Sequence, residues 1–131
     1  MALLIDTSVL IDLERASPSL PPDAQGQAIL ISAITASELL HGVERAADEA
    51  RRARRATFVE RILDVVPVLP IDLDVARVHA RIWASLLRRG SVIGAHDLLI
   101  AATALAHDLP LLTRNAREFA RVDGLQVIPS P

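Results

Sequence analysis

The stretch Leu3-Leu4-Ile5-Asp6-Thr7-Ser8-Val9-Leu10-Ile11-Asp12 stands near the start of the chain and decides its fold. Its apolar first part ends at an aspartate, and a second apolar pattern with helical spacing begins after two hydroxyl residues. We therefore expect a buried strand that turns into a helix, with Asp6 at the turn and Thr7 or Ser8 as the helix N-cap. Asp6 would then lie at the carboxyl edge of a sheet, where open α/β folds bind their ligands.

Apolar runs of strand length recur along the chain and alternate with helical patterns. We expect strands over 3–5, 28–32, 65–69, 109–113 and 125–128, and helices that begin near residues 7, 35, 48, 72, 95 and 115. Residues 1–131 are expected to form a single domain of the α/β class, a three-layer αβα sandwich with a mainly parallel central sheet.

Local signals sharpen several of these boundaries. Residues 35–38 (TASE) have the spacing of a capping box, which predicts a helix start at Thr35. Pro67 lies within the strand expected at 65–69 and places that strand at an edge of the sheet. The Pro- and Ser-rich residues 17–23 predict a loop, and the Ala- and Leu-rich helix over 95–106 is expected to be packed on almost all sides.

The composition excludes several classes of protein. All 14 basic residues are Arg, which rules out the P-loop, Schiff-base and lysine-dependent phosphoaspartate chemistries. The chain has no Cys, so it has neither disulfides nor thiolate metal sites. Asp6 interrupts the first apolar run, and the longest later run, 98–106, is far shorter than the ~20 residues that span a bilayer. We expect a soluble, cytoplasmic protein.

Four acids occupy equivalent places in this layout. Asp6 follows the first strand, Glu38 lies in the helix after the second, Asp97 begins the helix before the fourth, and Glu118 lies just past that strand, with Asn115 nearer its end. Taken singly, each acid has a structural explanation as a turn, cap, helix-dipole or solvated residue. In a parallel sheet, however, all four converge on one edge, and an all-oxygen set of ligands suits Mg²⁺ or Mn²⁺.

The segments 4–10 (LIDTSVL), 38–42 (ELLHG), 95–102 (AHDLLIAA) and 111–119 (LLTRNAREF) resemble, in this order, the PIN domain of the VapC toxin type. The resemblance covers almost the whole chain. It implies a Mg²⁺-dependent endoribonuclease that is the toxin of a toxin–antitoxin pair. It also implies an RNA substrate, a small VapB-like antitoxin and a homodimer.

Carried over position by position, the resemblance makes Asp6, Glu38 and Asp97 catalytic acids and metal ligands, with Asp6 and Asp97 as the two firmest ligands. Family members often have Asp directly after the Thr-Arg pair or just before the Phe, where this chain has Asn115 and Glu118. We favour Glu118 as the fourth catalytic acid and metal ligand, with Asn115 as a neutral neighbour. Which of the two touches the metal stays open.

Other polar residues lie beside these acids in the sequence. Thr7, Ser8 and Thr113 are expected either to hold the carboxylates and waters in place or to serve as helix caps and a strand end. Arg114 is a candidate for contacting an RNA phosphate. The run Arg51-Arg52-Ala53-Arg54-Arg55 has three interpretations: a solvated helix face, an RNA contact or an antitoxin contact.

The strongest alternative function is a PIN-like domain that binds RNA or a protein without cutting, because Asn115 leaves the fourth acid in doubt. The scattered histidines show no ligand spacing. His96 neighbours Asp97 in the sequence, but adjacent helical residues face different directions, so we do not expect it to be a general base.

Overall fold

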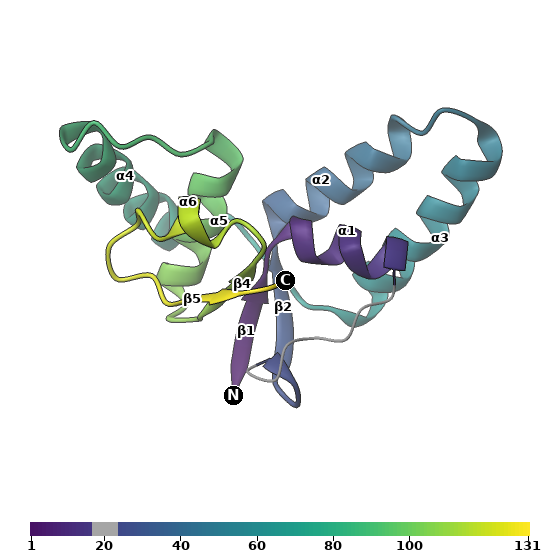
Figure 1. Ribbon diagram of the computed structural model, residues 1–131, viewed down its shortest axis with the longest axis horizontal. Helices are drawn as coiled ribbons and strands as arrows, with labels where there is room; N and C mark the ends of the chain where they lie inside the picture. Colours follow the sequence, from purple (N-terminus) through teal and green to yellow (C-terminus); the bar gives the residue numbers. More distant parts are fainter. Residues whose placement is uncertain (17–23) are drawn as a thin grey trace.

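A single parallel sheet organises the molecule (Figure 1). The computed structural model describes residues 1–16 and 24–131, and the loop expected at 17–23 lies outside the described residues. All the pairings between the strands are parallel, and the strand order is β3-β2-β1-β4-β5. The strands are β1 (Ala2–Ile5), β2 (Ala28–Ser32), β3 (Val68–Leu69), β4 (Leu111–Thr113) and β5 (Val127–Pro129).

Helices cover both faces of this sheet, so the predicted three-layer α/β fold is confirmed. The helices are α1 (Thr7–Ala16), α2 (Ala33–Glu44), α3 (Glu49–Val65), α4 (Leu73–Arg88), α5 (Ala95–Ala106) and α6 (Ala116–Phe119). Figure 1 shows α1, α2 and α3 on one side of the sheet and α4, α5 and α6 on the other. None of the helices in the described residues has the length and apolarity needed to cross a membrane.

Strand β1 shows how the sequence produces two cores. Three of its residues, Leu3, Leu4 and Ile5, are fully buried, and successive side chains of a strand point to opposite faces. Leu4 packs into the core under α4 and α5, whereas Leu3 and Ile5 pack into the core under α1, α2 and α3. The carboxyl end of β1 is therefore fixed from both sides, and the residue that follows it is held in place.

The strands at the edges are shorter than the sequence predicts. Val65 belongs to α3, and the next residue still donates to a carbonyl of that helix, from Val66 N to Ile62 O at 2.8 Å. The expected strand at 65–69 is thus reduced to β3, although its position at the edge of the sheet is confirmed. Pro67 has no amide to donate but accepts a hydrogen bond from Ile31. The strands expected at 109–113 and 125–128 likewise shift at their ends to β4 and β5.

Two predicted helix caps are wrong. Helix α2 begins at Ala33, and its N-cap is Ser32, whose Oγ accepts from Thr35 N at 3.1 Å, so Thr35 lies inside the helix rather than at its start. Helix α1 begins at Thr7, which places Thr7 and Ser8 inside it as well. The hydroxyls of Thr7 and Ser8 bond to side chains brought together by the fold, which a local capping rule does not anticipate.

Other helix predictions are confirmed. Helix α5 spans the predicted 95–106, and most of its later residues are buried. Asp72 caps α4 by accepting from Val75 N at 3.0 Å. Asp48 caps α3 in the same way, accepting from Arg51 N at 2.8 Å.

Candidate active site

The candidate site lies at the carboxyl edge of the sheet, where the strand order reverses. Strands β2 and β4 flank β1 on opposite sides, and both run parallel to it. The chains that leave β1 and β4 therefore diverge toward opposite faces of the sheet. Open α/β sheets place their ligand sites at this point, and Asp6 directly follows β1 there.

Asp6 is a buried carboxylate held by two hydroxyls. Its side chain is only 3% exposed. Ser8 Oγ donates to Asp6 Oδ2 at 2.8 Å, and Thr113 Oγ1 donates to the same oxygen at 2.7 Å. Burial raises the pKa of Asp6 above its ordinary value, and these hydrogen bonds partly oppose that rise. Because both hydroxyls bind Oδ2, neither of them occupies Oδ1.

The two hydroxyls are themselves oriented by the chain that follows β4. Ser8 Oγ accepts a hydrogen bond from the backbone amide of Arg114 at 3.2 Å, and Thr113 Oγ1 accepts one from the amide of Asn115 at 2.9 Å. Each hydroxyl therefore has its lone pairs engaged by an amide and its proton directed at Asp6. The predicted role of Ser8 and Thr113 in holding a carboxylate in place agrees with these contacts.

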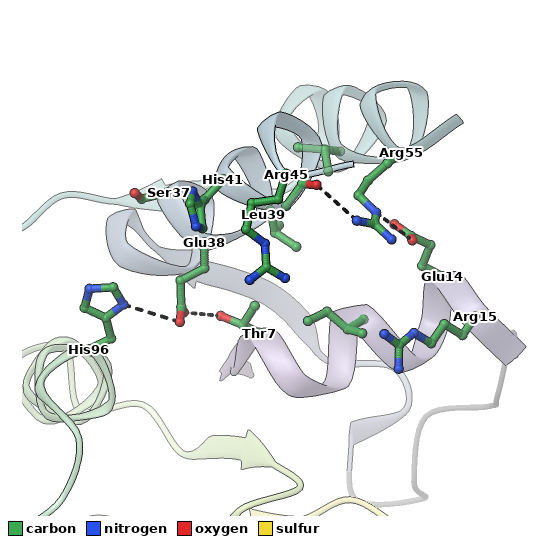
Figure 2. A pocket seen from close by; sticks show the side chains of 13 residues that line it. Thr7, Glu14, Arg15, Ser37, Glu38, Leu39, His41, Arg45, Arg55 and His96 are labelled. Atoms are coloured by element: carbon green, nitrogen blue, oxygen red, sulfur yellow. Dashed lines mark hydrogen bonds and ion pairs between the residues drawn. The ribbon is translucent and has the colours of Figure 1, made fainter. Parts of the chain in front are cut away.

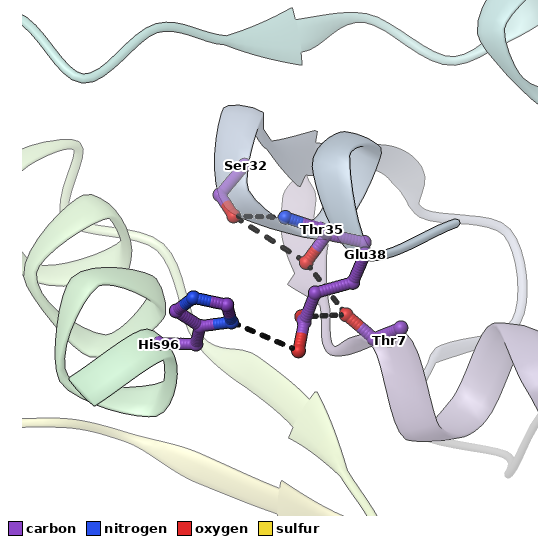
Figure 3. Close-up of polar contacts among 5 residues, drawn as sticks. All are labelled: Thr7, Ser32, Thr35, Glu38 and His96. Atoms are coloured by element: carbon purple, nitrogen blue, oxygen red, sulfur yellow. Dashed lines mark hydrogen bonds and ion pairs between the residues drawn. The ribbon is translucent and has the colours of Figure 1, made fainter. Parts of the chain in front are cut away.

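A chain of hydroxyls extends from the end of β2 to Glu38 (Figure 3). Thr7 Oγ1 donates to Glu38 Oε1 at 2.6 Å and lies 3.1 Å from Thr35 Oγ1, which in turn lies 3.3 Å from Ser32 Oγ. Since Thr7 has one proton and an ionised Glu38 can only accept, Thr35 must donate to Thr7. The same argument makes Ser32 donate to Thr35, so the chain has a single direction that ends on the carboxylate.

His96 also contacts Glu38, and the sequence did not indicate this contact. His96 Nδ1 lies 3.4 Å from Glu38 Oε2, although the two residues are 58 positions apart in the chain. The histidine lies in the first turn of α5 and is largely exposed. Only the packing of α2 against α5 brings the two side chains together, so no local pattern in the sequence could have indicated it.

Glu118 lies beside Asp97 at the start of α5. Glu118 Oε1 accepts a hydrogen bond from the backbone amide of Gly94 at 3.0 Å. A methyl group built on Gly94 would stand 3.8 Å from Asp97 Oδ2 and 3.9 Å from Glu118 Oε1. Both carboxylates therefore face the same short segment of backbone, and the chain that follows β4 meets the start of α5 there.

The four predicted acids share one electrostatic environment. Burial raises the pKa of Asp97 from 3.8 to about 6, and the negative charges of Asp6, Glu118 and Glu38 add to that rise. The charge of His96 opposes the rise without cancelling it. The sequence prediction that these acids converge is consistent with their mutual effect on the pKa of Asp97.

The two residues that follow Thr113 have different surroundings. Asn115 is the exposed N-cap residue of α6, and its side chain makes no capping hydrogen bond. Arg114 pairs with Asp12 in α1, with Nη1 2.8 Å from Oδ1 and 2.7 Å from Oδ2. This ion pair joins α1 to the end of β4 and occupies the guanidinium that we expected to face a phosphate.

Several arginines of the run in α3 already make ion pairs or hydrogen bonds within the fold. Arg51 pairs with Asp48 and Arg52 with Glu49, each at 3.6 Å, which agrees with the interpretation as a solvated helix face. Arg55 instead reaches across to Glu14 in α1 at 3.5 Å and donates to Gly42 O in α2 at 3.0 Å. It therefore ties three helices together.

The donors at the site suit a divalent cation, but the site is open. Within residues 1–16 and 24–131, no three His, Cys, Asp or Glu side chains lie close enough to hold an ion as they stand. The donor set is nevertheless all oxygen, and in the same residues its only ion-pair partner is His96. Uncompensated carboxylates repel one another, so a cation is what would draw them together.

Comparisons with known proteins agree with this architecture. The family model described as PIN domain matches residues 3–125. A Rickettsia bellii protein named Ribonuclease VapC is 38% identical over 131 residues, which cover 100% of this chain and 98% of that protein. A Rickettsia felis protein named Ribonuclease VapC1 is 39% identical over 128 residues, covering 98% and 96%.

Solved structures agree as well. A chain of the VapBC-5 toxin–antitoxin complex from Mycobacterium tuberculosis superposes with a TM-score of 0.80 at 33% identity, covering 98% of both chains. A chain of the DNA-bound VapBC complex from Salmonella typhimurium gives a TM-score of 0.86 at 27% identity, again covering 98% of both. The chain therefore belongs to the PIN domain family, within the group whose members are named VapC.

Proposed function

We propose that this chain is a Mg²⁺-dependent endoribonuclease that acts as the toxin of a toxin–antitoxin pair. One observation carries the proposal. Four carboxylates from distant parts of the chain act on one another at the carboxyl edge of the sheet, with no arginine paired to any of them in the described residues. The relatives named Ribonuclease VapC support the same activity.

Asp6 and Asp97 would hold the ion. Asp6 is the best-fixed ligand, because two oriented hydroxyls and the buried end of β1 set its position. A divalent ion at this site would polarise a water for attack on the phosphorus and neutralise charge on the phosphodiester. Manganese, which accepts the same oxygen ligands, is expected to substitute for magnesium.

Glu38 and Glu118 would orient the attacking water or complete the ligand set. Glu38 is one-third exposed and fixed at Oε1 by Thr7, which leaves its other oxygen facing His96 and solvent. Glu118 is held by the amide of Gly94. We assign the fourth position to Glu118 rather than Asn115, because Glu118 contributes to the raised pKa of Asp97.

The partners proposed for this chain are an RNA substrate, a small VapB-like antitoxin and a second copy of itself. Solved complexes of VapC proteins with their antitoxins support the second of these. Helix α4 carries exposed apolar side chains, among them Trp83 at 51% and Leu87 at 60%, which supports the homodimer.

A second candidate is a PIN-like domain that binds RNA or a protein without cutting. The open arrangement of the acids favours it, since no three metal-binding side chains in the described residues are preassembled. The two functions make different predictions for a single substitution. Replacing Asp6 with asparagine removes cleavage if the chain is a nuclease, and leaves a binding domain unaffected.

The test uses purified protein, defined RNA and mapping of the cut ends. Cleavage should stop in EDTA, return with Mg²⁺ or Mn²⁺ but not Ca²⁺, and be lost in Asp6→Asn. The matched control is Asp64→Asn, an exposed aspartate in α3. Cleavage that persists in EDTA, or an Asp6→Asn variant that cuts RNA as the wild type does, would reject the metal-dependent mechanism at Asp6. A wild type that binds RNA but does not cut it with Mg²⁺ or Mn²⁺ would favour the second candidate.

A further inference from the structure

A pocket of about 570 Å³ lies beside the acidic site, between α1, α2 and α3. Figure 2 shows Glu38 and His96 at one end of it. The pocket therefore begins where the candidate active site ends. A polymer whose reacting group lies at the acids would therefore extend directly into this pocket.

Two arginines from opposite walls point into this pocket. Arg45 reaches in from the C-terminal end of α2, and Arg15 reaches in from the last turn of α1 (Figure 2). Neither arginine makes an ion pair with any residue of 1–16 or 24–131. The third arginine of the pocket, Arg55, is already compensated by Glu14.

The spacing along α2 separates these charges from the acidic site. Glu38 and Arg45 are seven residues apart, which places them on the same face of the helix about 10.5 Å apart along its axis. One end of the pocket is therefore acidic and suits a cation, whereas the other end has two guanidiniums that pair with no residue of the part of the chain that the structure describes, and suits an anion. Guanidinium groups bind phosphate as planar forks, through paired hydrogen bonds.

We propose that Arg15 and Arg45 bind an RNA backbone phosphate that flanks the scissile one. The inference rests on the proposed function, because it takes the acids as the place where the RNA is cut. The occupant is a phosphodiester chain rather than a single small anion. Such a chain can place its scissile phosphate at the acidic end and a neighbouring phosphate at the arginines, because the pocket is continuous between the two ends. The partly exposed apolar side chain of Ile11, which also lines the pocket, offers contact to sugar and base.

The test measures RNA binding separately from cleavage. A fluorescein-labelled, single-stranded oligoribonucleotide is titrated with wild type and with the Arg15→Gln/Arg45→Gln double variant in EDTA, over a series of NaCl concentrations. Each lost phosphate contact lowers the slope of log affinity against log salt by about 0.7 for a single strand. Because the two arginines bind one phosphate, we expect a slope lower by roughly 0.7 and an affinity lower by at least tenfold.

Arg77→Gln is the control. It removes one positive charge, against two in the double variant, from an exposed position in α4 that does not line the pocket. A double variant whose salt slope matches that of Arg77→Gln would overturn the proposal. So would a double variant that binds RNA normally but loses a co-expressed antitoxin, because the pocket would then serve the protein partner. All three substituted positions are exposed, so circular dichroism should show unchanged folding.

The proposed function and this inference fail in different ways. If the wild type does not cut RNA with Mg²⁺ but the double variant still loses salt-dependent binding, the nuclease is rejected and the phosphate site stands. If the wild type cuts RNA and the double variant has unchanged KM and salt slope, the phosphate site is rejected and the nuclease stands. The expected result is a KM raised about tenfold in the double variant, with kcat within twofold of wild type.

Discussion

Replacing Asp97 with asparagine should make the metal-free protein more stable while it abolishes cleavage. Within the fold, burial and three neighbouring carboxylates raise the pKa of Asp97 from 3.8 to about 6. Between these two values the folded protein holds a proton that the unfolded chain has released, so stability falls as the pH rises from 4 to 6. Above pH 6 Asp97 is charged in both the folded and the unfolded state, so the folded protein carries the full free-energy cost of its charge.

The size of the effect follows from the pKa. A rise from 3.8 to about 6 corresponds to roughly 3 kcal/mol at full strength. Because Asp97 is partly exposed, solvent reduces both the cost of burying its charge and the repulsion by its neighbours, so we expect about half of that value. Loss of a negative charge from the first turn of α5 costs ~0.5 kcal/mol. The net gain in the free energy of unfolding should be near 1 kcal/mol at pH 7.5.

Thermal unfolding in EDTA measures this gain. Asp97→Asn should melt about 4 °C above wild type at pH 7.5, and the contribution of the raised pKa of Asp97 to that difference should shrink by about half at pH 5. Added Mn²⁺ should raise the Tm of wild type but not of the variant, because only the wild type keeps the ligand set. Asp64→Asn serves as the control and should match wild type throughout. An Asp97→Asn variant that melts at or below wild type in EDTA at pH 7.5 would refute this reasoning.

Three further substitutions test the surroundings of the acids and the surface of the molecule. Thr113→Val removes the 2.7 Å hydrogen bond to buried Asp6, so urea titration should show a loss of about 2 kcal/mol, and cleavage should fall roughly tenfold. Thr35→Val removes the hydroxyl that orients Thr7 toward Glu38, so kcat should fall several-fold. Thr35→Ser keeps a hydroxyl and should have nearly the kcat of wild type. Equal rates for the two variants would argue against a role for these hydroxyls. Trp83→Glu places a charge on the exposed apolar face of α4 and should convert a dimer to a monomer in sedimentation velocity, while far-UV circular dichroism shows an unchanged fold.

The parts of the fold that follow from local patterns could be predicted. The turn from β1 into α1 is encoded by an apolar run that stops at Asp6, and the structure has the strand and the helix on either side of it. Helix α5 was predicted with its observed bounds, because its composition favours helix throughout and Gly94 precedes it. The predicted convergence of the acids rests on one further assumption, that the strands are parallel, and the strand pairings confirm that assumption.

The parts that depend on distant side chains could not be predicted. Thr7 and Ser8 look like N-caps in the sequence, but the fold brings Glu38 and Asp6 close enough to accept their protons instead. The N-cap of α2 is Ser32 and not Thr35. Both residues have the hydroxyl that an N-cap requires, and only the backbone conformation decides between them.

Two long-range contacts of the site were missed for the same reason. The ion pair between Arg114 and Asp12 joins residues that are 102 positions apart. The contact between His96 and Glu38 depends on how α5 packs beside α2. Neither contact corresponds to a helical or strand periodicity or to a fixed residue spacing in the sequence. Each can be identified only in the folded structure.

The most direct test of the central claim is calorimetric titration of the purified protein with Mn²⁺ at pH 7.5. If Asp6 and Asp97 belong to one cation site, the wild type should bind saturably, and Asp6→Asn and Asp97→Asn should each weaken binding at least tenfold, while Asp64→Asn leaves it unchanged. Equal affinity in all four proteins, or no saturable binding by the wild type, would contradict the account.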